Sequence, residues 1–563
     1  MIAGIPMSRA TRTRLMAVPI AALLAIVFTW PLVPRLATAG RVDSGDGRYG
    51  IWNVAWVARA LTSDPAALYD ANIFYPHPGA LTFSEANLVA GVLAIPVWLA
   101  TGDGLAAANS VVLLSFVLSA LTMFALALRL TGGHVPASAL AALGFAYSPF
   151  AFARLAHVQL LMTFPLPLTL LALHHFLDRP IARRAVLVGA SMALTALACG
   201  YYGIFIGLTV GWGLVWFSVA RGTWRSPRAW LVAAVAPLTA AVLTVPFMLP
   251  YAAMRREGFA RSLDDARLFS ANWQAYLASA ELVHAWLLAR LDSWNEVLFP
   301  GILPLVFALV AVVWSRRGDD QAPSRTVVGF YLTMTLLAAW ASFGPAAGLY
   351  TVLFSTLPFF DMIRAPGRFG VMVTLGVCAL AALGLAATLR RLDGMPRRVA
   401  IAVLTVATLA GSTVGALPMV DRRPLHPVYS RLAQMPRGAV AEFPYFIDRT
   451  DRHRHTEYMF ESLHHWQPLI NGYSDHVPPE AAADALVLAG YPSEEARAVL
   501  RRRGARYVVV HWESYGHDPG MHDRVYAEVG IRLRLILDRD GMALFEVMNR
   551  SGTTGTTGTT GDR

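Results

Sequence analysis

Long apolar runs separated by short loops constrain the fold of this chain more than any other feature of its sequence. A helix that crosses a bilayer needs about 20 mostly apolar residues, and such runs recur from residue 15 to residue 418. Hydrophobic residues make up 56% of the chain and charged residues only 15%, whereas a soluble domain carries about 25% charged residues. These properties exclude a simple soluble enzyme, a coiled coil and a disordered protein. They predict an α-helical polytopic membrane protein.

Eleven of the runs are candidate membrane-spanning helices. They are 15–34, 105–128, 137–152, 160–177, 185–200, 203–220, 229–250, 297–314, 326–343, 369–389 and 399–418. The run 87–101 is a twelfth candidate, and the positions of the arginines decide whether it spans.

Loops rich in arginine are expected on the cytoplasmic side of a membrane. Residues 1–14 carry three arginines and should therefore be cytoplasmic. Four later loops are also rich in arginine: Arg179, Arg183 and Arg184; Arg221, Arg225 and Arg228; Arg316, Arg317 and Arg325; and Arg390, Arg391, Arg397 and Arg398. All four loops lie on the cytoplasmic side only if the run 87–101 does not span the membrane. We therefore predict that this run lies in the outer membrane interface or forms a re-entrant segment. This leaves eleven spans, with the N-terminus inside and the C-terminus outside.

The composition divides the chain into a transmembrane domain, 15–418, and a smaller extracytoplasmic domain, 419–550. The transmembrane domain has two long outer loops, 35–104 with interfacial helices, and 251–296. The second domain contains strand-like runs at 439–446, 506–512, 532–538 and 542–547, and helical stretches at 479–490 and 493–503. This alternation predicts a small α/β domain. Residues 551–563 have nothing to bury and are expected to be disordered.

Several chemistries are excluded by residue types that are absent or sparse. The chain contains no lysine, so all 47 basic residues are arginine, which excludes a Walker A P-loop and a lysine Schiff base. Cys199 and Cys378 lie in apolar runs, which favours a role as small residues of the hydrophobic core over a role as metal ligands or disulfide partners. The net charge of +11 comes from arginines in short loops. It therefore indicates membrane topology and not nucleic-acid binding.

The first outer loop contains acidic residues that could carry chemistry. Asp46 lies just beyond the first span in a glycine-flanked turn, where a carboxylate can approach a substrate closely. It could instead cap the helix expected from Tyr49, as aspartates commonly do, although Asp43 is the better placed cap. Glu85 could cap the helix expected at 87–101, or it could act at a catalytic site.

A series of short motifs along the chain resembles one known family. The motifs are GD(x)5W(x)3W from Gly45, NIFYP from Asn72, Ser84-Glu85, Arg154-(x)2-His157-(x)-Gln159 followed by Pro165-Leu166, Tyr201-Tyr202-Gly203, Leu298-Phe299-Pro300-Gly301, the stretch Ile363 to Phe369, and Asn471-Gly472-Tyr473-Ser474. In order and spacing they resemble a bacterial branch of the GT-C superfamily. Its members are multispan glycosyltransferases that use sugars linked to polyprenyl phosphate.

The resemblance implies a role for each matching residue. An acidic residue just after the first span is the catalytic base in this superfamily, and Asp46 matches that position. A base is needed because a hydroxyl is a poor nucleophile until its proton is removed. The phosphate that leaves must be matched by cations, and the planar guanidinium of arginine suits it. A second carboxylate, Glu85 or Glu296, with Asp43 also possible, could orient the acceptor or hold a cation.

The remaining candidates would bind the substrate. They are Arg154, His157, Gln159, Arg261 and Arg364 for polar groups, and Trp52, Trp56, Tyr75, Tyr201 and Tyr202 for sugar faces or the polyprenyl chain. Alternatives stay open for both groups. Arginines at the ends of spans also contact lipid headgroups, and aromatic residues there also form an interfacial belt.

A metal is possible but is not indicated by any ligand spacing. Some superfamily members need a divalent cation such as Mg or Mn, and sites built from oxygen ligands are hard to read from sequence. In the second domain, four histidines, His453, His455, His464 and His465, lack a recognised spacing, so we predict no metal site there. The loop from Asn471 to Ser474 is either part of an acceptor site or a tight structural turn.

These inferences together predict an integral glycosyltransferase of a bacterial inner membrane. It would transfer a hexose or pentose from a polyprenyl-phosphate donor to an extracytoplasmic polysaccharide, glycolipid or protein, with inversion. Two alternatives are a transporter or flippase of lipid-linked saccharides and a non-catalytic scaffold for envelope assembly. A transporter would carry charges in mid-span and paired broken helices, and few charges lie in the predicted spans. The sequence does not identify the sugar, the polyprenol, the acceptor or the oligomeric state.

Overall fold

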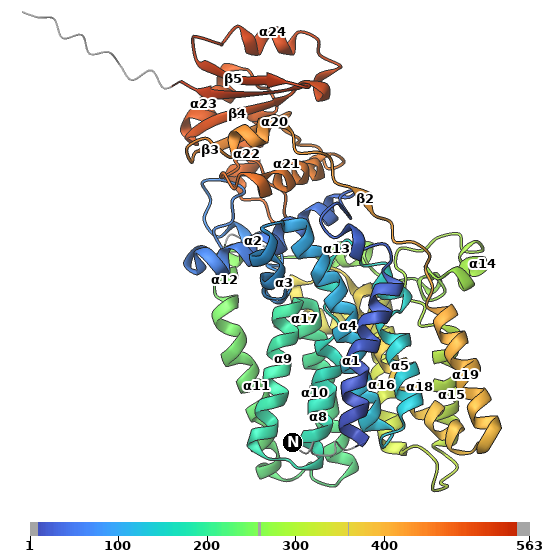
Figure 1. The fold of residues 1–563 in the computed structure, drawn as a ribbon. Coiled ribbons are helices and arrows are strands. Elements are labelled where there is room, and N and C mark those ends of the chain that lie inside the picture. Colours follow the sequence, from blue (N-terminus) through green and yellow to red (C-terminus); the bar gives the residue numbers. More distant parts are fainter. Residues whose placement is uncertain (1–8, 257–259, 359, 549–563) are drawn as a thin grey trace, which may run out of the picture. The chain divides into compact units, whose positions relative to one another are not determined.

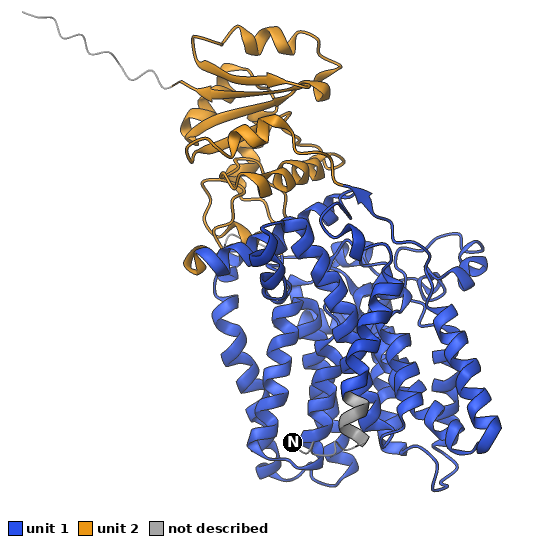
Figure 2. Ribbon diagram, in the orientation of Figure 1, with its two compact units in different colours: residues 1–63, 85–421 blue, residues 64–84, 422–563 orange. Residues whose placement is uncertain are grey.

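The structure is a computed structural model, and it describes residues 9–256, 260–358 and 360–548. It divides into two compact units, shown in Figure 2. Unit 1 comprises residues 1–63 and 85–421, and unit 2 comprises residues 64–84 and 422–563. The tail 551–563 lies outside the described residues, as does most of the predicted cytoplasmic segment 1–14.

Unit 1 is a bundle of helices (Figure 1). The helices are α1 (Arg9–Phe28), α2 (Gly45–Ser63), α3 (Leu88–Thr101), α4 (Gly104–Leu130), α5 (Val135–Ala146), α6 (Pro149–Phe152), α7 (Val158–Leu161), α8 (Pro165–Asp178), α9 (Ala182–Ala198), α10 (Gly200–Ala220), α11 (Pro227–Met248), α12 (Tyr251–Arg256), α13 (Leu263–Leu268), α14 (Ala285–Leu288), α15 (Ile302–Trp314), α16 (Arg325–Ser342), α17 (Leu349–Thr356), α18 (Gly370–Arg390) and α19 (Gly394–Gly411). Two short strands, β1 (Ala39–Gly40) and β2 (Val420–Asp421), pair antiparallel.

Several of these helices are apolar and long enough to cross a membrane. Within the described residues there are six: Gly104–Leu130, Val135–Phe152, Val158–Asp178, Gly200–Ala220, Pro227–Met248 and Pro366–Arg390. Three shorter apolar helices are Leu15–Phe28, Leu88–Thr101 and Ile302–Trp314. The chain is therefore a multi-pass membrane protein, and the number of eleven spans stays a prediction. Helix α3 has 14 residues, which span about 21 Å at 1.5 Å per residue, less than a hydrocarbon core of about 30 Å.

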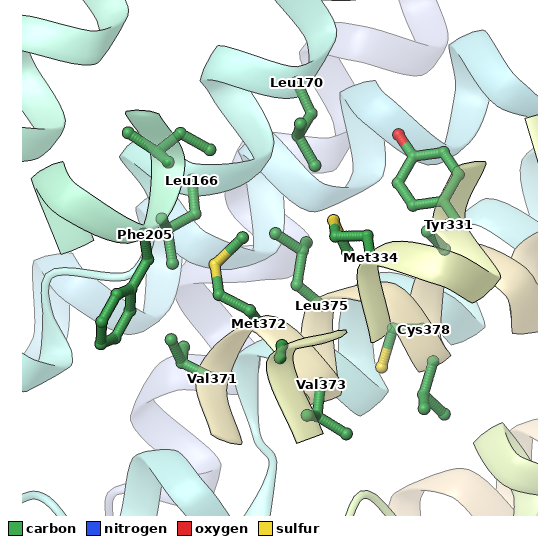
Figure 3. Close-up of a cluster of buried hydrophobic side chains, with 14 of the residues drawn as sticks. Leu166, Leu170, Phe205, Tyr331, Met334, Val371, Met372, Val373, Leu375 and Cys378 are labelled. Carbon is green, nitrogen blue, oxygen red and sulfur yellow. The ribbon is translucent and has the colours of Figure 1, made fainter. Parts of the chain in front are cut away.

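Helix α18 lies at the centre of the hydrophobic core of unit 1. Its apolar window is completely buried, and Figure 3 shows Met372 of α18 in the same cluster as Leu166 of α8 and Phe205 of α10. Glycine allows a neighbouring helix to approach closely. A Cβ on Gly384 would lie 1.9 Å from the carbonyl oxygen of Phe307 in α15, so only glycine fits at this contact.

The arginine-rich loops meet at one end of unit 1. Arg129, near the end of α4, pairs with Asp178 at the end of α8 at 2.5 Å. Arg391, after α18, pairs with Asp319 between α15 and α16 at 2.6 Å. Its neighbour Arg390 donates to the backbone carbonyl of the residue after α4. The loops after α8, α15 and α18 therefore lie at the same end of unit 1, while the position of the run 87–101 in the membrane stays a prediction.

Unit 2 is a small α/β domain, as the sequence predicted. Its helices are α20 (Pro427–Leu432), α21 (His455–Glu461), α22 (Pro479–Leu488), α23 (Glu494–Arg502) and α24 (Met521–Tyr526), and its strands are β3 (Ala439–Phe443), β4 (Ala505–His511), β5 (Leu533–Arg539) and β6 (Met542–Val547). The strands form one sheet in the order β3-β4-β6-β5, with β3 parallel to β4 and the other neighbours antiparallel. The four predicted strands are confirmed, with small differences at their ends.

Residues 64–84 pack with unit 2, so the contacts divide the predicted outer loop 35–104 between the two units. The side-chain amide of Asn72 donates to the hydroxyl of Ser462 at 3.2 Å. The backbone N–H of Phe74 donates to a carbonyl in the loop after residue 470 at 3.1 Å. The segment is therefore bound through hydrogen bonds between positions far apart in the sequence, which no local pattern indicates.

The loop that begins at Asn471 supports the fold of unit 2. The side chain of Asn471 accepts the backbone N–H of Glu442 at 2.8 Å and donates to the carbonyl of the same residue at 2.9 Å. Gly472 lies against Phe74, whose ring atoms would be 2.7 Å from a Cβ at that position. Of the two alternatives for this loop, these contacts favour the structural turn.

Candidate active site

Asp46 lies in the first turn of α2, and the way this helix begins leaves its carboxylate available. The hydroxyl of Ser44 accepts the backbone N–H of Gly47 at 3.1 Å, so Ser44 caps the helix. This corrects the expectation that Asp43 or Asp46 provides the cap. Asp43 instead pairs with Arg41 at 3.0 Å. The side chain of Asp46 is 55% exposed.

His157, the residue before α7, contacts Asp46 directly. Its Nε2 lies 3.2 Å from Oδ2 of Asp46. This hydrogen bond lowers the pKa of Asp46, as do the positive charges of Arg368 and Arg364, while partial burial opposes them. The carboxylate is therefore ionised at neutral pH and can accept a proton.

Arg364 and Arg368 belong to a segment that Tyr201 of α10 holds in place. The hydroxyl of Tyr201 accepts the backbone N–H of Arg364 at 3.0 Å, and the guanidinium of Arg368 lies 4.2 Å from the centre of its ring. The guanidinium of Arg364 lies 5.0 Å from the ring centre of Phe269. Both guanidinium groups thus lie over aromatic rings, an attractive contact for a cation.

Sequence reasoning selected Arg364 and missed Arg368. Both belong to the motif 363–369, so a signal was present in the sequence. The contribution of Arg368 depends on its position over Tyr201 and on its charge near Asp46. Neither property can be read from the spacing of the motif.

Arg154 and Glu296, which the sequence predicted as separate site residues, form an ion pair with each other. Arg154 donates to the carboxylate of Glu296, and each side chain is only 12% exposed. The guanidinium of Arg154 also lies 4.9 Å from the ring centre of Phe150. Glu296 packs against Gly367, where a Cβ would lie 2.8 Å from Cγ of the glutamate. The charge of Arg154 is therefore already balanced within the protein.

Glu85 binds the start of α10. Its carboxylate accepts the backbone N–H of Gly200, where the helix dipole favours a negative charge. Its backbone carbonyl accepts the side-chain amide of Asn53 in α2 at 3.0 Å. Glu85 therefore caps α10 and joins it to α2, which differs from the cap of the run 87–101 that the sequence suggested.

Three of the predicted aromatic residues are buried. Trp52 is fully buried and Trp56 is 7% exposed. Tyr202 is fully buried, and its hydroxyl donates to the carbonyl of Leu160 at 2.7 Å. These side chains serve packing within unit 1, and their burial argues against the predicted contact with a sugar face. Tyr201, by contrast, is partly exposed.

Gln159 and Arg261 complete the predicted set. Gln159 is half-buried in α7. The backbone N–H of Arg261 donates to the carbonyl of Asp361 at 2.8 Å, three residues before Arg364. Arg261 is thus placed beside the arginine segment, while the role of Gln159 stays a prediction.

The carboxylates of this site do not fit a divalent cation. Such an ion takes several oxygen ligands, but Asp46, Glu85 and Glu296 each bind a different donor of the protein. Within the part of the chain that the structure describes, no group of three or more His, Cys, Asp or Glu could hold a metal ion.

Comparison with known proteins gives matches among solved structures. No family model and no curated protein matches the chain. The arabinofuranosyltransferase AftD from mycobacteria matches with 15% identity and a TM-score of 0.59, over 97% of this chain and 40% of AftD. The oligosaccharyltransferase of Archaeoglobus fulgidus matches with 13% identity and a TM-score of 0.49, over 89% of this chain and 70% of that protein. ArnT from Cupriavidus metallidurans matches with 16% identity and a TM-score of 0.42, over 96% of this chain and 98% of ArnT.

The match to AftD has the highest TM-score of these three, and the fold comparison rests on it. The chain covers only 40% of the length of AftD, and at 15% identity the similarity shows the fold alone. The chain therefore shares its fold with part of AftD, an arabinofuranosyltransferase, which agrees with the glycosyltransferase fold that the resemblance of the motifs predicted.

Proposed function

We propose that the chain is an integral membrane glycosyltransferase that uses a polyprenyl-phosphate-linked sugar and an extracytoplasmic acceptor. One observation carries the proposal: the carboxylate of Asp46 lies 3.2 Å from His157 and close enough to Arg364 and Arg368 for their charges to lower its pKa, in a unit that shares its fold with AftD. A carboxylate can take the proton of a hydroxyl, and arginines can bind a phosphate. The site thus combines the two functions that sugar transfer from a lipid phosphate requires.

The proposed reaction is a single displacement. The hydroxyl oxygen of the acceptor attacks the anomeric carbon of the sugar while Asp46 removes the hydroxyl proton. The bond between the anomeric carbon and the phosphate oxygen breaks, and its electron pair leaves with the polyprenyl phosphate. One displacement inverts the anomeric configuration. The leaving phosphate is stable as an anion, so the reaction needs no general acid.

Arg364 and Arg368 are the proposed ligands of the donor phosphate. Their guanidinium groups lie against Phe269 and Tyr201, which limits their movement before the substrate binds. Cations that are already in position stabilise developing charge without reorganisation. Arg154 is a weaker candidate, because its charge is already balanced by a buried carboxylate.

We also propose that the end of unit 1 with Asp46 faces the outside of a bacterial inner membrane. Helix α8 begins shortly after the loop with His157 and ends at Asp178, among the arginine-rich loops. The positive-inside rule places those loops in the cytoplasm, and Asp46 then lies outside. In this topology the donor enters from the bilayer, and the predicted domain 419–550 follows the last span on the outer side.

The test is a transfer assay with purified protein in lipid nanodiscs. Polyprenyl-phosphoryl arabinofuranose, mannose and glucose serve as labelled donors, and envelope glycans serve as acceptors. AftD is an arabinofuranosyltransferase, which is why the panel includes a pentose. We expect transfer from at least one donor and a loss of about 10²- to 10⁴-fold in Asp46→Asn, the usual contribution of a general base.

A matched variant and a second assay separate the competing functions. Asp43→Asn removes a charge from the same loop and should retain transfer. Full activity in Asp46→Asn would exclude Asp46 as the base. Counterflow of intact labelled donor across proteoliposomes, with no transfer, would instead support a flippase.

A further inference from the structure

The two ring nitrogens of His157 have different surroundings. Its Nε2 lies 3.2 Å from Oδ2 of Asp46. Its Nδ1 is buried and has no hydrogen-bond partner among the residues that the structure describes. A histidine that binds a phosphate must direct an N–H group at it. The Nε2 atom of His157 is already bound to Asp46, so this nitrogen is not available to a phosphate in the arrangement that the structure describes.

The contact with Asp46 places a proton on Nε2 of the ring. An ionised carboxylate only accepts hydrogen bonds, so Nε2 must carry the proton that Asp46 and His157 share. His157 is therefore a donor to Asp46.

The backbone fixes this donor relative to α2. The backbone N–H of His157 donates to the carbonyl of Arg154 at 2.8 Å, which closes a tight turn before α7. The next residue, Val158, lies close to α2, because a Cβ on Gly50 would be 3.5 Å from its side chain. The imidazole and the first turn of α2 are thus parts of one packed arrangement.

We infer that His157 is a positioning residue for Asp46: its Nε2–H group holds Oδ2, so that Oδ1 takes the proton of the acceptor hydroxyl. The inference rests on the proposed function, since it needs Asp46 to act as the base. In this inference His157 orients the base, Asp46, and the arginines bind the donor phosphate.

The groups that face Asp46 from other elements are His157, Arg364 and Arg368. The two arginines act through their charge, whereas His157 is the hydrogen-bond partner and the largest cause of the lowered pKa of Asp46. From the same loop and helix, Arg41 and Arg48 act on Asp43. Loss of the imidazole should therefore release the carboxylate and raise the pKa of Asp46.

Two variants and a control test the inference, with the donor of the panel that the wild-type protein turns over. His157→Ala removes the hydrogen bond, and His157→Gln restores a neutral N–H donor. His175→Gln changes an exposed histidine near the end of α8 and should leave kcat and KM unchanged. For each protein, kcat and the KM for the donor are measured across pH.

We expect His157→Ala to lower kcat by roughly 100-fold, the scale of a misplaced catalytic group, with little change in KM. The acid limb of its kcat–pH profile should move to higher pH, because Asp46 acts in its deprotonated form and the pKa of Asp46 rises. His157→Gln should recover most of kcat and return the acid limb toward that of the wild-type protein. Thermal unfolding tests whether each variant folds. If His157→Ala does not fold, His157→Phe takes its place, because phenylalanine fills the same space without a hydrogen-bond donor.

Two outcomes would overturn the inference. A raised KM for the donor with an unmoved acid limb would assign His157 to the phosphate. Equal losses of kcat in the alanine and glutamine variants, with unmoved acid limbs, would show a structural role only. Failure of the proposed function looks different: Asp46→Asn would then remain active, or the wild-type protein would transfer none of the sugars.

Discussion

The buried ion pair of Arg154 and Glu296 makes a quantitative prediction. Each side chain is only 12% exposed, so the loss of one partner leaves the other charge with little access to water. Such a loss costs about 3–5 kcal/mol, whereas replacement of a whole buried pair by apolar residues of similar size is often nearly neutral. We therefore expect Glu296→Leu and Arg154→Met each to lose about 3–5 kcal/mol of stability, and the double variant to recover most of it.

The assay is a double-mutant cycle on the free energy of unfolding, measured by denaturation in one detergent. The coupling between the two positions is the difference between the effect of the double variant and the sum of the single effects. The matched control is the pair of Arg129 and Asp178, whose side chains are 37% and 39% exposed. Because exposed pairs contribute about 0–1 kcal/mol, Asp178→Leu should cost no more than that.

Two results would refute this reasoning. If Glu296→Leu cost no more than Asp178→Leu, the charge of Arg154 would have to be solvated without its partner. If the double variant were as unstable as the sum of the single ones, the losses would come from packing, for example of Glu296 against Gly367, and not from an unbalanced charge.

Three further predictions concern other parts of the chain. Arg368→Ala should raise the KM for the donor by roughly 10- to 100-fold, as expected for the loss of a hydrogen bond to a charged group; an unchanged KM would exclude Arg368 as a phosphate ligand. Asn471→Ala should lower the stability of unit 2 by about 1–3 kcal/mol, because backbone groups of Glu442 lose their partners, and thermal unfolding with an unchanged kcat would show this. For the topology, Asp43→Cys should react with an impermeant thiol reagent from outside and Arg183→Cys only from inside. Both native cysteines are buried and should give little background, and the reverse labelling pattern would contradict the proposed orientation.

The features of this chain that could be predicted from the sequence are those that depend on composition along one segment. The helical unit, and the meeting of the arginine-rich loops at one end, follow from the lengths of apolar runs and the charges between them. The strands of unit 2 follow from short apolar runs between turns. Asp46 could be selected because it follows the first run directly in a glycine-flanked turn.

The features that could not be predicted are contacts between distant positions. Arg154 and Glu296 are 142 positions apart, and Asn72 and Ser462 are 390 apart. Such pairs form only when several elements pack together, and no local period signals them. The cap of α2 could not be predicted for a different reason. Ser44 and the neighbouring aspartate are both favoured at that position, so the sequence does not decide between them.

The arginines beside Asp46 imply an order of events in the proposed reaction. In the free protein, their charges and the hydrogen bond from His157 lower the pKa of Asp46, which makes it a weaker base. A bound donor phosphate brings a negative charge to Arg364 and Arg368. Their effect on the carboxylate is then partly cancelled, and the pKa of Asp46 rises. Donor binding should therefore strengthen the base before the acceptor is deprotonated.

This order can be tested from pH profiles of the wild-type protein. The acid limb of kcat/KM for the donor reports the free protein, and the acid limb of kcat reports the donor complex. Asp46 acts in its deprotonated form, so activity is lost as pH falls through its pKa, and the limb of kcat should lie at the higher pH. Arg368→Ala should move the acid limb of kcat/KM to higher pH, because the loss of its charge raises the pKa of Asp46 in the free protein. Limbs that coincide in the wild-type protein would mean that the donor phosphate does not neutralise the arginines beside Asp46.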